Sequence, residues 1–209
     1  MDATGHDSIS PRWWFVPLAF VLAGLVLLPI DVSVSSYFHG QRSRTIDEFW
    51  EICETFGHGI GASFIVIAAV VIDPVGWRNL TGLLVGSLGS GLVADLLKLC
   101  IHRTRPRDID LTTCTVWDTF IRSGTASKSM HSIPSSHTAT AVGLAIVLSA
   151  LYPRGRYLFG VLAILVGMQR IVTQAHFPSD VCAGAAVGSA VGLFIATTAG
   201  KRNKPDAAH

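Results

Sequence analysis

The chain has 209 residues, of which 50% are apolar and only 14% are charged, and its formal net charge is +2. Soluble domains carry about 25% charged residues and could not bury so many apolar side chains at this length, so the composition excludes a soluble globule as well as a disordered chain. The near-neutral charge argues against nucleic acid as a partner. An integral membrane protein remains, with room for roughly six spans of about 20 residues each.

Apolar runs separated by polar stretches predict the membrane-spanning helices. The acidic N-terminal tail, residues 1–12, has no cleavage site after the first run, which favours a retained span over a signal peptide. Residues 41–56 mix aromatic and acidic side chains and predict an amphipathic helix at the membrane interface. A basic tail, residues 200–209, ends the chain. The predicted spans are 13–30, 57–72, 80–101, 138–152, 157–172 and 180–199.

These elements predict an all-α, polytopic membrane protein with six transmembrane helices. We expect a single membrane-embedded domain over residues 1–209, with a long polar loop, 102–137, between the third and fourth helices. The short turns at 73–79 and 153–156 carry basic residues, as does the C-terminal tail, which favours the cytoplasm for both termini.

Charged and polar side chains stand at the ends of the apolar runs, where they are costly and usually functional. Lys98 ends the third run, His137 opens the fourth and Arg170 ends the fifth. His176 and Asp180 flank the turn into the sixth. Because odd-numbered spans end on the face where even-numbered spans begin, we expect these side chains to meet on one side of the membrane.

The residue types in this group suit a phosphate ligand. Lys98, Arg105 and Arg170 are cations, and arginine binds phosphate through paired hydrogen bonds. The segment 134–137, Pro-Ser-Ser-His, opens a predicted helix, and the free N–H groups of a helix N-terminus bind anions. These residues predict a phosphate site.

Two histidines supply reactive groups beside that site. His176 and Asp180 form a histidine–carboxylate pair, in which the carboxylate fixes the tautomer and leaves one ring nitrogen free to attack. His137 is available as a general acid for the leaving oxygen. We interpret Asp95, one turn before Lys98, as a partner of that lysine.

The spacing of these residues resembles the type 2 phosphatidic acid phosphatase family. Six residues separate Lys98 from Arg105-Pro106, as in the first family motif, and the segment 134–137 resembles the second, usually Pro-Ser-Gly-His. The third motif is matched by Arg170, His176 and Asp180, with intervals of five and three residues. Ser136 departs from the usual glycine, and it either crowds the phosphate or adds a hydrogen bond. Gln169 departs from a serine that commonly precedes the arginine.

The resemblance implies a metal-independent membrane phosphatase that needs no cofactor. It implies that His176 is a nucleophile forming a phosphohistidine, that Asp180 orients it, and that His137 serves as acid and then as base. The implied phosphate ligands are Lys98, Arg105, Arg170, Ser135 and Ser136. Arg103 and Arg107, which flank Arg105, are interpreted as solvated or as contacts for an anionic headgroup.

The implied substrates are phosphomonoesters or diphosphates of membrane lipids. Phosphatidylglycerophosphate, phosphatidic acid, undecaprenyl diphosphate and lipid A phosphate all remain open. The site typically faces the periplasm in bacterial members, which implies an inner-membrane protein whose partners are its substrate and membrane lipids. A monomer is compatible with the sequence, and the oligomeric state stays open.

Three other functions remain as alternatives. A lipid phosphotransferase would use the same residues with a lipid in place of water as the acceptor. Vanadium haloperoxidases share similar anion-binding motifs, but they are soluble. A lipid transporter would also carry polar residues within its spans, although it would not need a histidine–carboxylate pair beside a second histidine and several cations. The sequence also leaves open a disulfide between Cys100 and Cys114.

Overall fold

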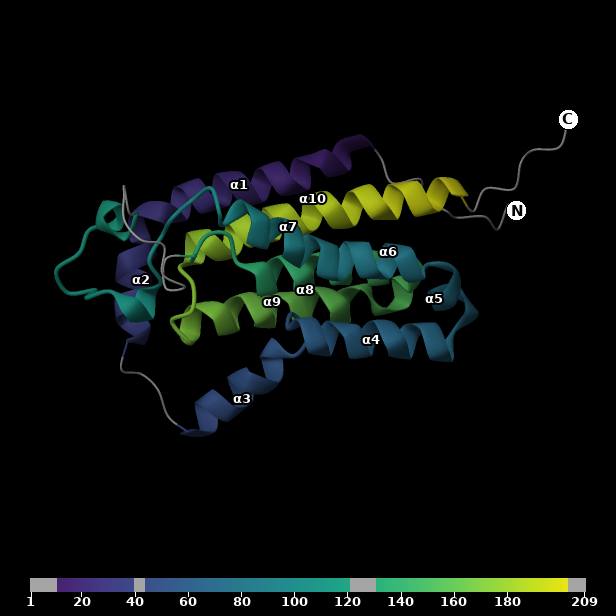
Figure 1. The fold of residues 1–209 in the computed structure, drawn as a ribbon, viewed down its shortest axis with the longest axis horizontal. Coiled ribbons are helices and arrows are strands. Elements are labelled where there is room, and N and C mark those ends of the chain that lie inside the picture. Colours follow the sequence, from purple (N-terminus) through teal and green to yellow (C-terminus); the bar gives the residue numbers. More distant parts are fainter. Residues whose placement is uncertain (1–10, 40–43, 121–130, 203–209) are drawn as a thin grey trace, which may run out of the picture.

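The computed structural model describes residues 11–39, 44–120 and 131–202. The predicted terminal tails lie largely outside these residues. The described chain is helical, with isolated β-bridges that join Arg103 to Phe120 and to His131. The longer helices lie side by side along one long axis (Figure 1). Their bounds in chain order are η1 Pro11–Trp14, α1 Phe15–Leu27, η2 Leu28–Ile30, α2 Asp31–Phe38, α3 Arg44–Glu54, α4 Gly59–Ile72, α5 Pro74–Arg78, α6 Leu80–Leu84, η3 Val85–Gly89, α7 Ser90–Leu97, η4 Pro106–Asp108, η5 Val116–Thr119, α8 Ser136–Leu151, η7 Pro153–Gly155, α9 Arg156–Val172 and α10 Pro178–Arg202.

Each predicted apolar run coincides with a helix or a run of joined helices. The first continues beyond its predicted end through η2 into α2, and the third is built from α6, the π-helical turn η3 and α7. Several helices begin at local signals that the sequence displays. Pro74 opens α5 behind Asp73, whose side chain accepts the Val75 N–H at 2.9 Å. Ser135 is the N-cap of α8.

Four helices of the described chain are long and apolar enough to cross a membrane, at Phe15–Phe38, Leu80–Leu97, Pro153–Val172 and Pro178–Thr198. Residues Asp47–Glu54 of α3 and the whole of α4 form a pair bent by 52°, and this pair would count as a fifth spanning helix. The fourth predicted span corresponds to α8, which has only 16 residues. The finding supports a membrane protein with four or five such helices, and the count of six stays a prediction.

Apolar side chains on the outside of the bundle are exposed, as expected for contact with lipid. Val71 and Ile72 near the end of α4 are 78% and 80% exposed, and similar residues line α1 and α9. Such a continuous apolar surface has no place on a soluble monomer. The surface therefore agrees with the exclusion of a soluble globule.

Helix α8 lies inside the bundle, where it packs against α10, α9 and α7. Small residues allow the close approach of α8 and α10. A Cβ atom added at Gly184 or at Gly188 would overlap the backbone of α8, at the Ser135 and Ala139 carbonyls respectively. Gly184 and Gly188 of the last helix therefore serve packing within the chain.

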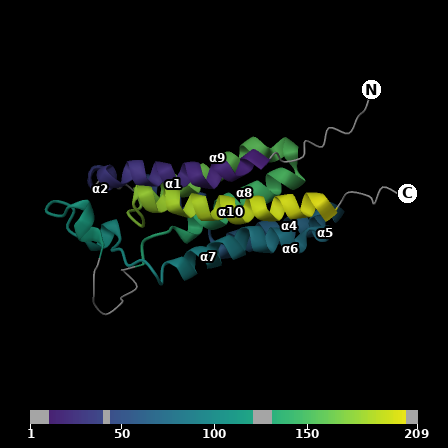
Figure 2. The same ribbon diagram turned by 90° about the horizontal axis from the view of Figure 1, so that it is seen from above.

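The alternating directions of the helices bring the polar span ends together. The ends of α7 and α9 and the beginnings of α8 and α10 lie at one end of the bundle, near α2 and the polar loop (Figures 1 and 2). The turn around α5 and the turn between α8 and α9 lie at the other end. This is the arrangement that the alternation of span directions predicts.

Candidate active site

His176 and Asp180 lie at the turn into α10, and both are buried. Asp180 is in the first turn of the helix, where its Oδ2 accepts the Phe177 N–H at 2.9 Å and the Ser132 hydroxyl at 2.6 Å. Its distance to His176 Nδ1 is 3.9 Å, which is longer than a hydrogen bond. The two residues of the expected histidine–carboxylate pair are therefore close together but not hydrogen-bonded to each other. The Asp180 oxygen atoms accept hydrogen bonds from other groups.

Burial also sets the charge state of His176, whose side chain is only 3% exposed. Loss of water lowers its pKa to about 4, although the nearby Asp180 carboxylate acts in the opposite direction. The ring is consequently neutral near pH 7, which is the form that a nucleophile requires.

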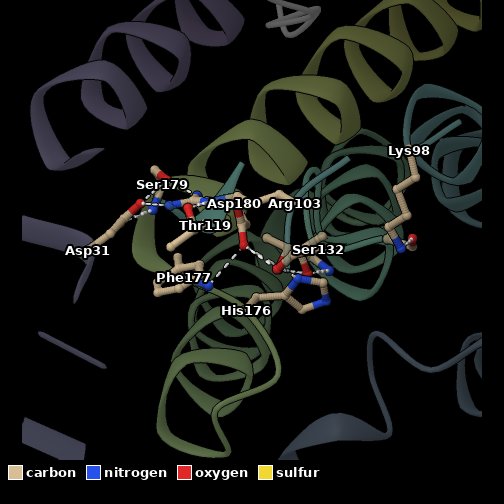
Figure 3. Close-up of polar contacts among 12 residues, drawn as sticks. Asp31, Lys98, Arg103, Thr119, Ser132, His176, Phe177, Ser179 and Asp180 are labelled. Carbon is tan, nitrogen blue, oxygen red and sulfur yellow. Dashed lines mark hydrogen bonds and ion pairs between the residues drawn. The ribbon is translucent and has the colours of Figure 1, made fainter. Parts of the chain in front are cut away.

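A buried arginine holds the other oxygen of Asp180. Arg103 Nη1 donates to Asp180 Oδ1 at 2.6 Å, and its Nη2 donates to Asp31 Oδ2 at 2.7 Å (Figure 3). The guanidinium carbon lies over the rings of Phe120 and Phe177, 4.7 and 4.2 Å from their respective centroids. All three charged side chains are fully buried. Asp31, Arg103 and Asp180 therefore form one enclosed ion-pair network, called here the buried network.

The buried network also connects distant parts of the chain. Asp31 begins α2 and accepts the Ser179 N–H of α10 at 2.9 Å. Arg103 Nε donates to Thr119 Oγ1 at 3.0 Å, and the Arg103 carbonyl accepts the Ser132 N–H at 3.0 Å. The interpretation of Arg103 as solvated or as a headgroup contact is wrong, because the fold closes around it.

The N-terminus of α8 forms a second wall of the site. The Ser135 hydroxyl is buried and accepts from Thr138, through its N–H at 3.4 Å and its hydroxyl at 2.9 Å. The Ser136 hydroxyl contacts both Lys98 and Asp95, which are themselves paired at 2.9 Å. Ser136 thus adds polar contacts where the family usually has glycine, and Asp95 is the partner of Lys98 that the sequence suggests. In Figure 3, His176 lies between the buried network and Lys98.

A third group of contacts centres on Glu54, the last residue of α3. Its Oε2 lies 2.6 Å from Arg170 Nη2 and 3.1 Å from Gln169 Nε2, and its Oε1 lies 3.0 Å from His137 Nε2. Arg170 Nε in turn donates to Gln169 Oε1. The Glu54 carboxylate therefore joins His137 and Arg170, two of the predicted site residues. It also contacts Gln169, the residue that departs from the family pattern.

Arg105 and Arg107 stand between two cavities. Arg105 follows α7 at the start of η4, and its buried Nε has no hydrogen-bond partner among the described residues. Burial, followed by the charge of Arg107, lowers the pKa of Arg105, but an arginine remains charged. The first cavity, of about 460 Å³, is lined by Asp95, Lys98, Leu99, Arg105, Arg107, Asp108 and His131. The second, of about 330 Å³, is lined by Asp47, Glu51, Glu54, Arg105, Arg107, Gln169, Arg170, Thr173 and Ala175.

Arg103, Asp31, Glu54 and Ser132 are the residues of this site that the sequence reasoning missed. Two of them carry a usable signal. Asp31 ends the first apolar run and Glu54 precedes the second, so the alternation of span directions also brings both to this end of the bundle. Arg103 gave no such signal, because it lies in a polar loop among other arginines.

Within the described residues, no group of three or more His, Cys, Asp or Glu side chains could hold a metal ion. The four cysteines are free, including Cys100 and Cys114.

The chain is similar to known proteins in both sequence and fold. Residues 79–204 match the family model of the PAP2 superfamily. A lipid A 1-phosphatase from Rhizobium etli is 30% identical over 88% of this chain and 84% of its own length. A lipid A 1-phosphatase from Rhizobium johnstonii is 37% identical over 51% of this chain and 42% of its own. A transmembrane PAP2-type phosphatidylglycerolphosphate phosphatase from Bacillus subtilis has a similar fold, with a TM-score of 0.66 and 22% identity, over 92% of this chain and 99% of the other.

Proposed function

The chain belongs to the PAP2 superfamily, and we propose that it is a membrane enzyme that removes a phosphate group from a lipid. The observation that carries the proposal is the convergence of two histidines and three cations at one end of a membrane-protein fold. The similarity to lipid A 1-phosphatases over most of the chain supports a lipid substrate. We place lipid A 1-phosphate first among the candidate substrates for the same reason.

His176 is the nucleophile in this proposal. Its neutral ring nitrogen attacks the phosphorus atom, the bond from phosphorus to the lipid oxygen breaks, and a phosphohistidine forms. Positive charge develops on the imidazole as the new bond forms. The Asp180 carboxylate, 3.9 Å from Nδ1, stabilises that charge and becomes available for a hydrogen bond when the ring adjusts.

His137 serves as the acid and then as the base. It gives a proton to the leaving lipid oxygen, so that an alcohol departs rather than an alkoxide. It then takes a proton from a water molecule, which attacks the phosphohistidine, and inorganic phosphate and free His176 are released. The proton that His137 lost in the first step is restored in the second.

The phosphoryl oxygens are held by cations and by the N-terminus of α8. Lys98, Arg105 and Arg170 supply charge, Ser136 contributes the first N–H group of the helix, and Ser135 caps that helix. The unpartnered Arg105 Nε between the two cavities supports this assignment, because a buried donor of this kind needs an acceptor. The Ser135 hydroxyl caps α8 and its N–H donates to the Asp180 carbonyl at 3.0 Å, so in this proposal Ser135 fixes the N-terminus of α8 against α10, and Ser136 presents its N–H to the phosphate.

Phosphate release tests the activity. Purified protein in detergent, with a chelator present, is given lipid A 1-phosphate, phosphatidylglycerophosphate, phosphatidic acid and undecaprenyl diphosphate. We expect release from at least one lipid, and a loss of at least about 10³-fold in His176→Ala with an unchanged elution profile. The proposal fails if wild type releases nothing from the panel, and the nucleophile assignment fails if His176→Ala turns over normally. Activity that the chelator abolishes would refute metal independence.

We further propose that the protein lies in the inner membrane with both termini in the cytoplasm and the site facing outward. Cys100 lies at the site end of the bundle and is exposed, so it serves as a reporter in a variant that keeps only this cysteine. A membrane-impermeant maleimide added to spheroplasts should label it without lysis. Labelling that requires lysis would reverse the orientation.

A further inference from the structure

Helix α3 delivers a carboxylate to the site although it lies outside all three family motifs. Its polar residues Asp47, Glu51 and Glu54 line the second cavity, and Glu54 is its last residue. Phe49 and Ile52 are 52% and 73% exposed. The helix therefore presents apolar side chains outward while its acidic side faces the site, as an interfacial helix does.

The backbone fixes Glu54 in this place. The Glu54 carbonyl accepts the N–H groups of Gly57 and His58, both at 2.9 Å, and so closes the turn between α3 and α4. That turn lies directly against α8, because a Cβ added at Gly57 would lie 2.6 Å from the His137 carbonyl oxygen. Only glycine permits this approach. The position of Glu54 relative to His137 is thus set by main-chain packing as well as by its side chain.

The side-chain contacts of Glu54 select two groups that the proposed chemistry uses. Its carboxylate lies 3.0 Å from His137 Nε2 and 2.6 Å from Arg170 Nη2, and its side chain is 26% exposed. Gln169, which is almost fully buried, donates to the same carboxylate and accepts from Arg170. The departure at Gln169 thereby acquires a physical role, since its amide joins Glu54 to Arg170.

We propose that Glu54 is a positioning residue that holds His137 as a protonated donor and fixes Arg170 for the phosphate. The inference rests on the proposed function and adds a residue to it. Burial lowers the pKa of His137, and the Glu54 carboxylate at 3.0 Å opposes that shift by favouring the imidazolium, which is the form that protonates a leaving oxygen. The ion pair with Arg170 fixes one side of the guanidinium while its other N–H groups stay available.

A different role would make Glu54 a stand-in for the phosphate, displaced when substrate binds. A stand-in would be expected to contact the other members of the anion site. Among the described residues, the ion pairs of Glu54 are with His137 and Arg170 and do not include Lys98 or Arg105. This contact pattern, together with the fixed backbone, favours the positioning role.

The test compares Glu54→Gln with Glu48→Gln on the same helix. Both variants remove one negative charge from α3, but Glu48 does not line either cavity. For Glu54→Gln we expect kcat to fall about 10- to 100-fold while KM changes less than about 3-fold, because general acid catalysis contributes roughly 10²–10⁴ in rate. Glu48→Gln should match wild type. Glu54→Asp, which restores the charge on a shorter side chain, should recover part of the loss.

The pH profile separates positioning from a purely structural role. His137 is faced by Glu54 from α3, Arg170 from α9, His58 at the start of α4 and Asp95 from α7. Removing the Glu54 charge should move the alkaline limb of kcat to lower pH, whereas a general loss of structure would not move it. Inhibition by inorganic phosphate reports on the anion site in the same samples.

Each outcome decides the matter. A lower KM and tighter phosphate inhibition with undiminished kcat in Glu54→Gln would identify a displaced stand-in and overturn the proposal. Wild-type kinetics in Glu54→Gln would overturn it as well. If Glu54→Gln does not fold, Glu54→Asp carries the test, and a wild-type pH limb and kcat in that variant count against a role set by the carboxylate position. Wild-type activity in the same assay shows that the proposed function stands independently.

Discussion

The N-termini of α8 and α10 lie side by side in the site, and the chain treats them in opposite ways. At α10 the N–H groups of Phe177 and Ser179 donate to carboxylates of the chain itself, both at 2.9 Å. Those carboxylates, Asp180 and Asp31, are fully buried, and both pair with Arg103. At α8 the helix is capped by Ser135, and the neighbouring cations line open cavities.

The difference follows from the chemistry that both ends share. A helix N-terminus carries partial positive charge and free donors, so it attracts an anion. At α10 the anions belong to the protein, and the result is an enclosed support for Asp180 and the adjacent His176. At α8 the donors stand beside Lys98 and Arg105, which suits an anion that arrives from outside. The comparison predicts that changes at α10 act on stability and changes at α8 act on substrate kinetics.

Removing Arg103 should break the buried network at the N-terminus of α10, called here the closed terminus. This change should produce the largest effect on folding. Arg103→Met leaves Asp31 and Asp180 as buried carboxylates without a counter-charge, which costs about 3–5 kcal/mol. Arg103→Lys keeps the charge and loses the planar fork, so its effect should be smaller. Denaturation of the purified protein in detergent measures both variants. Wild-type stability in Arg103→Met would mean that the buried network does not support the fold.

Arg105→Gln tests the N-terminus of α8, called here the open terminus because the cations beside it line cavities. Because Arg105 Nε has no partner within the described chain, the substitution breaks no hydrogen bond of that nitrogen, and the unfolding midpoint should stay close to wild type. We expect kcat/KM for the lipid substrate to fall about 10²-fold, as for the loss of one donor to transition-state charge. A large loss of stability with little change in kinetics would place Arg105 in the support rather than in the anion site.

The sequence predicted the residues around the cavities better than it predicted the buried network. Lys98, Arg105, Arg170 and His176 could be found because motif spacing and the alternation of span directions are local or topological properties. Arg103 could not be found, because its role depends on Asp31, 72 residues away, and on Asp180, 77 residues away. Those pairs exist only after α2, the polar loop and α10 have packed together.

The fold was predicted at the same level. Length and hydropathy located every apolar run, since burial in lipid leaves a continuous signal. The bend between α3 and α4 and the continuation of α1 into α2 were not predicted. They depend on which polar groups the site end must satisfy, such as Asp31 and Glu54, and hydropathy does not report this.

The lowered pKa of His176, next to the buried network, predicts how folding stability depends on pH. Burial lowers its pKa to about 4 from an ordinary value of 6.5, so the unfolded chain binds a proton that the folded chain does not. Stability should therefore decrease as the pH falls from about 6.5 towards 4. The neutral nucleophile should persist over the same range, so kcat/KM should not show an acid limb near 6.5 that belongs to His176. Thermal unfolding against pH, in wild type and His176→Ala, measures the first effect, and an unchanged slope in the variant would contradict it.

Ser136→Gly should have the smallest effect, because it alters the open terminus without removing an ion pair. The substitution restores the usual family residue and deletes a hydroxyl that contacts Lys98 and Asp95, while the 2.9 Å pair between those two residues remains. Glycine costs less than about 1 kcal/mol at a helix position, and kcat/KM should stay within about 3-fold of wild type because the backbone N–H is retained. Ser135→Ala is the matched change one residue earlier, and the loss of the N-cap should cost about 1 kcal/mol of stability. A loss of activity in Ser136→Gly comparable to that of Arg105→Gln would make the Ser136 hydroxyl a phosphate ligand. The first turn of α8 would then bind through a side chain that most of the family lacks.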